Sequence, residues 1–117
     1  MQAIIDKMNG FLKMDSELEF KEFNQYYKEV MDKLQKDYQN MGKDELIQIA
    51  AVLQIVAANA LDRGNRKDAN VKKFKKMVEK CQFWFSAIEM RVHKEFGMGK
   101  QDFDAEVDGI FSDFDEE

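Results

Sequence analysis

The sequence contains no proline and no threonine, and it has only one cysteine, one histidine and one tryptophan. Without proline the strongest helix breaker is missing, and without threonine a common strand former is missing, so the composition favours helices. The single Cys81 has no intramolecular disulfide partner, and the first ten residues lack the basic-then-apolar layout of a secretion signal. We therefore expect a helical protein of a reducing, cytoplasmic compartment.

The chain does contain enough apolar material for one folded domain. Of its 117 residues 44% are hydrophobic and 12% are aromatic, which suits a single core and excludes disorder throughout. The expected fold class is all-α: a small helical bundle of three long helices and a short N-terminal one over residues 1–97. A disordered, acidic C-terminal tail over residues 98–117 is expected to follow.

Apolar residues at helical spacing predict the first two helices. The first is short and covers about residues 4–12. The second is predicted to follow a capping box, in which Ser16 and Glu19 satisfy each other's free backbone N–H groups, and to end at Gly42.

The next two predicted helices supply most of the core. Residues 45–61, with an Asp44 cap and Gly64 at the end, are apolar on nearly all sides and predict a central helix. This helix is too short and too rich in amides for a membrane span, and its alanines permit close approach inside the bundle or in a homo-oligomer. Residues 71–96, closed by Gly97, predict the last helix, with Trp84 among its core residues.

Charge is distributed unevenly along the chain. Eight acidic residues and no base follow Lys100. The whole chain has a net charge of −5, so residues 1–101 carry about +3 without those eight acids. A mildly basic body is thus joined to a strongly acidic end.

The acidic end alternates carboxylates with apolar side chains, a pattern too charged to fold alone. It resembles in style the acidic, aromatic C-terminal tips of single-stranded-DNA-binding proteins and the short clamp-docking peptides of replication factors. The resemblance implies a protein partner with a basic-rimmed pocket. The partner-binding residues would be Phe103, Val107, Ile110, Phe111 and Phe114, together with Asp113 and Asp115. A tail that only increases solubility is the alternative.

The outer face of the last predicted helix is a second candidate surface. Its lysines neutralise phosphates and its Phe83 stacks on bases if the ligand is single-stranded nucleic acid. The candidate residues are Lys72, Lys73, Lys76, Lys80, Phe83 and Arg91, with Arg63 and Arg66 from the preceding loop. Packing of Phe83 against another helix or subunit is the competing interpretation.

No catalytic or metal-binding constellation is present in the sequence. Cys81 and His93 lie on one predicted helix, roughly 18 Å apart along its axis, so they cannot form a dyad. Residues 104–115 resemble an EF-hand calcium loop, but Asp115 replaces the bidentate glutamate. We expect no cofactor and no metal.

These observations favour a non-catalytic accessory protein that docks on a larger protein machine, in nucleic-acid metabolism, through its acidic and aromatic tail. The alternative is direct binding of single-stranded nucleic acid by the last helix, with the tail as a competitor. An enzyme with an intersubunit site is the third hypothesis.

Overall fold

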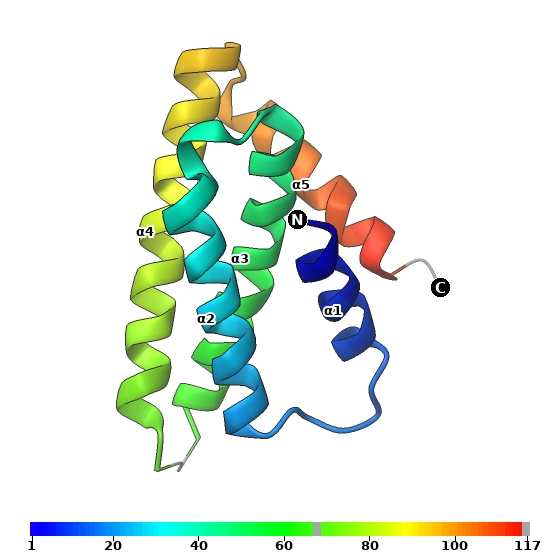
Figure 1. The fold of residues 1–117 in the computed structure, drawn as a ribbon, viewed down its shortest axis with the longest axis vertical. Coiled ribbons are helices and arrows are strands. Elements are labelled where there is room, and N and C mark those ends of the chain that lie inside the picture. The colour runs from blue at the N-terminus through cyan, green and yellow to red at the C-terminus, as the bar shows by residue number, and fades with distance from the viewer. Residues whose placement is uncertain (67–68, 116–117) are drawn as a thin grey trace.

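The computed structural model describes residues 1–66 and 69–115. Within these residues the chain forms five α-helices, one short 3₁₀ helix and no strand, so the all-α class is confirmed. Figure 1 shows α4 (Val71–Phe96) along one side of the molecule and α1 (Gln2–Leu12) with α5 (Lys100–Asp115) on the opposite side. The helices are α1 (Gln2–Leu12), α2 (Phe20–Asp37), η1 (Tyr38–Asn40), α3 (Lys43–Gly64), α4 (Val71–Phe96) and α5 (Lys100–Asp115).

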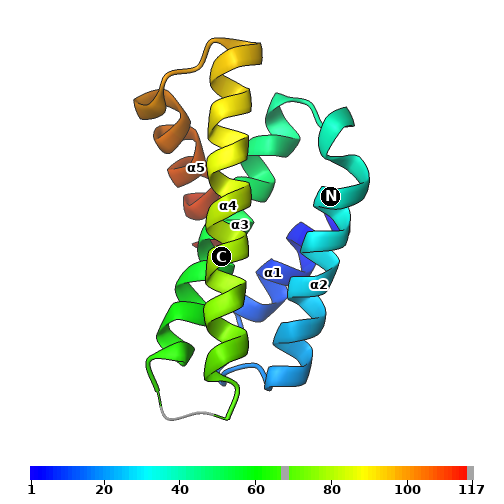
Figure 2. The same ribbon diagram turned by 90° about the vertical axis from the view of Figure 1, so that its left-hand side faces the viewer.

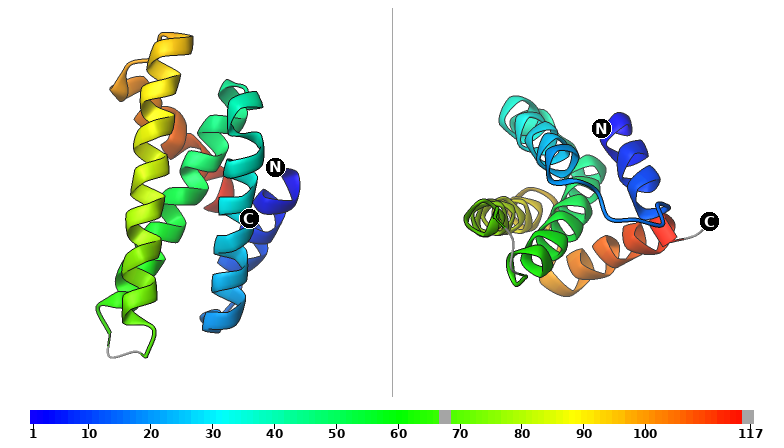
Figure 3. Two further views of the ribbon diagram at one scale, coloured as in Figure 1. Left: turned by 60° about the vertical axis from the view of Figure 1, so that its left-hand side comes forward. Right: turned by 90° about the horizontal axis from the view of Figure 1, so that it is seen from below.

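Helix α3 is the central element, as its apolar composition predicts. The view from below in Figure 3 shows α1, α2, α4 and α5 arranged around it. Its side chains Ile49, Ala50, Ala51 and Leu53 are fully buried, so Ala50 and Ala51 pack inside this bundle. Among the described helices α3 is also the one long and apolar enough to cross a membrane, a criterion that a buried central helix meets as well.

Helix α4 follows the predicted bounds closely. Phe74, Cys81 and Ile88 are buried on its inner side, while Trp84, expected in the core, is only half-buried. The helix ends at Gly97, whose φ of 68° lies in the left-handed region that glycine adopts without steric penalty.

The expected capping box before α2 is absent, which corrects the predicted start of this helix. Helix α2 begins at Phe20, and Ser16 and Glu17 lie in the irregular segment that joins it to α1. The carboxylate of Glu17 instead pairs with Arg63, in the last turn of α3, and with Arg66, in the loop that follows α3. A long-range ion pair has thus taken the place of the local cap.

The expectation of a disordered tail is corrected over the last sixteen described residues, which form helix α5. Phe103 and Val107 are 1% exposed, and Phe114 is buried as well. They belong to the same core as the side chains of α3. The helix is possible because Phe103, Val107 and Phe114 recur at helical spacing, so its acids lie outside while its apolar side chains pack inward.

Candidate binding surface on helix α4

The N-terminal half of α4 presents a basic face to solvent. Figure 2 looks onto the side of the molecule that α4 forms. Lys72, Lys73, Lys75, Lys76 and Lys80 are all exposed along it. Within residues 1–66 and 69–115, none of these five lysines takes part in an ion pair. Only Lys73 has a defined contact, with its ammonium 5.3 Å from the centre of the Phe20 ring.

The C-terminal half of α4 adds exposed apolar side chains to this face. Phe83 is 67% exposed and Met90 is 59% exposed, with Ala87 between them at helical spacing. The ring of Phe83 makes an edge-type contact with the neighbouring Trp84, at 5.8 Å between centroids. No other helix covers Phe83, so the competing interpretation of packing inside the bundle does not hold in this structure. We call Lys72, Lys73, Lys75, Lys76, Lys80, Phe83, Ala87 and Met90 the α4 outer face.

Arg91, expected on the same surface, has a different position. Its guanidinium donates to the carbonyl oxygens of Tyr38, Gln39 (3.2 Å) and Met41 (2.9 Å), where α2 and η1 end. It also pairs with Glu95 through Nε, at 3.0 Å. Arg91 therefore satisfies free helix-end carbonyls and is largely committed to the fold.

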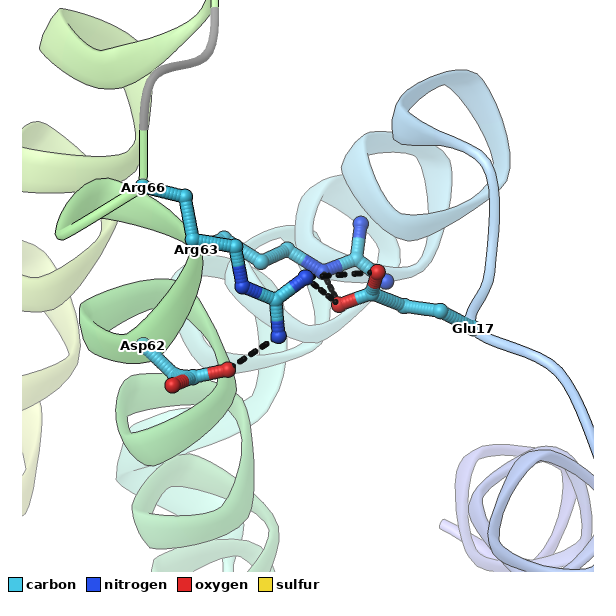
Figure 4. Close-up of polar contacts among 4 residues, drawn as sticks. All are labelled: Glu17, Asp62, Arg63 and Arg66. Carbon is cyan, nitrogen blue, oxygen red and sulfur yellow. Dashed lines mark hydrogen bonds and ion pairs between the residues drawn. The ribbon is translucent and has the colours of Figure 1, made fainter.

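Arg63 lies in the last turn of α3 and is buried, whereas Arg66 lies in the loop after α3, as expected, and is exposed. Arg66 donates two hydrogen bonds of 2.8 Å to Glu17 and another to Asp62, as Figure 4 shows. The hydrogen bonds to Glu17 and Asp62 raise the pKa of Arg66. Arg63 is 6% exposed, and its guanidinium lies 4.6 Å from the centre of the Phe23 ring. Both arginines are therefore engaged with the protein itself.

The predicted docking residues of the acidic end are mostly covered. Phe103, Val107 and Phe114 are buried, and Ile110 and Phe111 are half-buried against the same core. Asp113 is exposed, and the side chain of Asp115 lies outside the described residues. The acids of this segment are held on an ordered helix, and the flexible competitor expected from the sequence is not present in residues 100–114.

The remaining titratable groups form no reactive cluster in the described part of the chain. Cys81 is 1% exposed, and burial raises the pKa of its thiol to about 12. His93 faces the loop after α4, with Nδ1 3.2 Å from the carbonyl oxygen of Met98. The segment that resembles an EF-hand loop is helical, and no group of three potential metal ligands occurs among the described residues.

Lys72, Lys73, Lys76, Lys80 and Phe83 are exposed on α4, as the sequence predicts, whereas Lys75 and the structural roles of the three arginines were not predicted. Lys75 was accessible to the same helical-wheel argument, whereas the partners of the arginines lie some fifty residues away in sequence. Comparison with protein-family models, with curated proteins and with solved structures finds no match to this chain.

Proposed function

We propose that this protein is a non-catalytic binding protein, an accessory factor in nucleic-acid metabolism, which binds single-stranded nucleic acid through the α4 outer face. The observation that carries the proposal is the exposed Phe83 on the same side of α4 as five exposed lysines that form no ion pair within the described residues. Lysines neutralise phosphates, and an exposed aromatic ring offers a stacking surface that any unpaired base can use.

The placement of the lysines supports an anionic ligand. Lys72 and Lys73 lie in the first turn of α4, and this turn contains no acidic residue. The N-terminal end of a helix carries a partial positive charge, so cations there are unfavourable for the free protein. A bound phosphate backbone reverses the sign of this interaction.

Docking on a protein through α5 is less favourable energetically. To present Phe103, Val107 and Phe114 to a partner, α5 must leave the core. Exposing each such side chain costs about 1.5–3 kcal/mol, and the three together approach the 5–15 kcal/mol that stabilises a typical domain. The α4 outer face needs no such rearrangement.

Fluorescence anisotropy with a labelled single-stranded oligonucleotide and its duplex, over a series of salt concentrations, tests the proposal. Phe83→Ala should weaken single-strand binding by about 1–3 kcal/mol, because one stacked base is lost, and should change duplex binding much less. Phe96→Ala is the matched control, since Phe96 is also exposed on α4 but lies outside the lysine cluster.

The lysines are tested in the same assay. Lys76→Gln and Lys80→Gln should each lower the slope of log K against log salt by about one, because each removes one phosphate contact. Lys28→Gln, at an exposed position on α2, should leave the slope unchanged. Absence of binding to either oligonucleotide at low salt would overturn the proposal, and equal effects of Phe83→Ala and Phe96→Ala would remove the stacking role.

A further inference from the structure

A cavity of about 130 Å³ lies where α1, the segment between α1 and α2, helix α2 and helix α3 meet. Its walls are mainly apolar and include Phe11, Leu18, Phe23, Ile55 and Val56. Arg63 lines it as well, together with a few uncharged polar groups and Glu17. The cavity thus joins an apolar interior to one buried cation, and it lies outside the α4 outer face.

The guanidinium of Arg63 is short of hydrogen-bond acceptors. Its side chain is 7% exposed, and its buried Nε has no hydrogen-bond partner among the described residues. The buried Nε lies 3.2 Å from Oε1 of Glu17, an ion-pair contact drawn in Figure 4, but the two atoms form no hydrogen bond. A buried guanidinium N–H group without an acceptor raises the free energy of the folded protein, because the group has given up its hydrogen bonds to water.

Glu17 is a weak counter-ion for this arginine. Its side chain is 45% exposed and belongs to the irregular segment between α1 and α2. Both of its oxygens accept hydrogen bonds of 2.8 Å from Arg66, which is itself half-exposed. Glu17 is therefore held mainly by its two hydrogen bonds from Arg66. With Arg63 it makes one ion-pair contact and no hydrogen bond.

We propose that this cavity binds a small monocarboxylic acid with an apolar body, whose carboxylate takes the place of Glu17 on Arg63. A planar guanidinium and a carboxylate match in a two-bond fork, which supplies the acceptor that Nε of Arg63 lacks. An apolar cavity of about 150 Å³ is known to hold benzene, so the cavity suits a body of that size. The inference does not depend on the function proposed for α4.

Isothermal titration calorimetry with sodium benzoate tests this site, with the full chain and two further ligands. Benzamide has the same shape without the charge, and inorganic phosphate has the charge without the apolar body. Benzoate should bind to the protein. In NMR spectra the backbone amide signals of Leu18, Ile55 and Val56 should then shift. Benzamide and phosphate should each bind at least about tenfold more weakly, because a charge-assisted hydrogen bond and the apolar burial are each worth that much.

Variants separate the role of Arg63 from general effects on the fold. Glu17→Gln removes the internal competitor at an exposed position and should tighten benzoate binding by up to about fivefold, the range of a half-exposed ion pair. Asp62→Asn is the matched control, because Asp62 pairs with Arg66 but does not line the cavity. It should leave the affinity unchanged.

Arg63→Gln should weaken benzoate binding at least about tenfold, since the fork of donors is lost. If this variant does not fold, the Glu17→Gln result still decides the question. Equal affinities for benzoate and benzamide, weaker benzoate binding by Glu17→Gln, or no benzoate binding by either the native protein or Glu17→Gln would each overturn the proposal.

Discussion

Cys81 carries a buried thiol, and the ionisation of this thiol makes the stability of the folded protein depend on pH. Burial raises the pKa of the thiol to about 12. In the unfolded chain the thiol ionises from about pH 9, its ordinary range, while in the folded chain it keeps its proton. The stabilisation from the protonated thiol is therefore complete below pH 9 and is lost as the pH rises towards 12.

Urea unfolding at a series of pH values checks this prediction. The unfolding free energy of the native protein should decline between pH 9 and pH 11 more steeply than that of Cys81→Ala, which lacks the thiol. Tyr26, whose pKa is also raised by burial, is present in both proteins and cancels in the comparison. Parallel pH profiles would show that Cys81 is accessible to water in the folded state.

The long-range partners of the three arginines could not be predicted from the sequence. The sequence predicts phosphate contacts for Arg91 from its place on the outer face of the last helix, and for Arg63 and Arg66 from the loop before that helix. The structure assigns Arg66 to Glu17, 49 residues away, and Arg91 to carbonyl groups at least 50 residues away. Sequence spacing indicates which residues share a helix face, but it carries no signal for partners that only the tertiary fold brings together.

At the scale of elements, α3 and α4 were predictable and α5 was not. A long apolar helix and an amphipathic one with a terminal glycine have strong periodic signals. In α5 the acids Asp102, Asp104 and Glu106 alternate with apolar residues, and this alternation favoured the prediction of a disordered tail. The same segment also has an apolar stripe at helical spacing. That stripe is formed by Phe103, Val107, Ile110, Phe111 and Phe114. The high density of acids predicts disorder, but burial of the apolar stripe against α3 and α1 stabilises the helix.

Two glycines at helix ends should respond to alanine with opposite signs. Gly97 has φ of 68°, where a β-carbon costs about 1–2 kcal/mol, so Gly97→Ala should destabilise the protein by about that amount. Gly64 is the last residue of α3 and has no positive φ, and an added β-carbon meets Phe74 at 3.5 Å, an ordinary contact. Gly64→Ala should stabilise by about 0.5–1 kcal/mol, because alanine loses less backbone entropy on folding.

Thermal unfolding followed by circular dichroism compares these two variants with the native protein. The sequence assigned both glycines to the same role as helix-ending residues, and the structure separates them. Gly64 belongs to the helix, and only Gly97 terminates one in the left-handed conformation. Loss of stability in Gly64→Ala would mean that α3 and α4 approach more closely than this structure shows.

For the molecule as a whole, the question is whether the acidic segment is an appendage or part of the fold. A chain ending at Gly99 loses Phe103, Val107 and Phe114 from the core and exposes the α3 surface that α5 covers. At about 1.5–3 kcal/mol for each buried side chain, this loss is comparable with the total stability of a typical domain. The truncated protein should therefore lose cooperative thermal unfolding and expose apolar surface to a fluorescent probe.

A full-length variant is the control for the loss of negative charge. It carries Asp102→Asn, Glu106→Gln, Asp108→Asn and Asp113→Asn, which remove four exposed acids and keep the apolar stripe, and it should still unfold cooperatively. If the truncated protein instead had the same thermal unfolding midpoint as the full chain, α5 would not be needed for the fold. Its aromatic side chains would then be available to a partner.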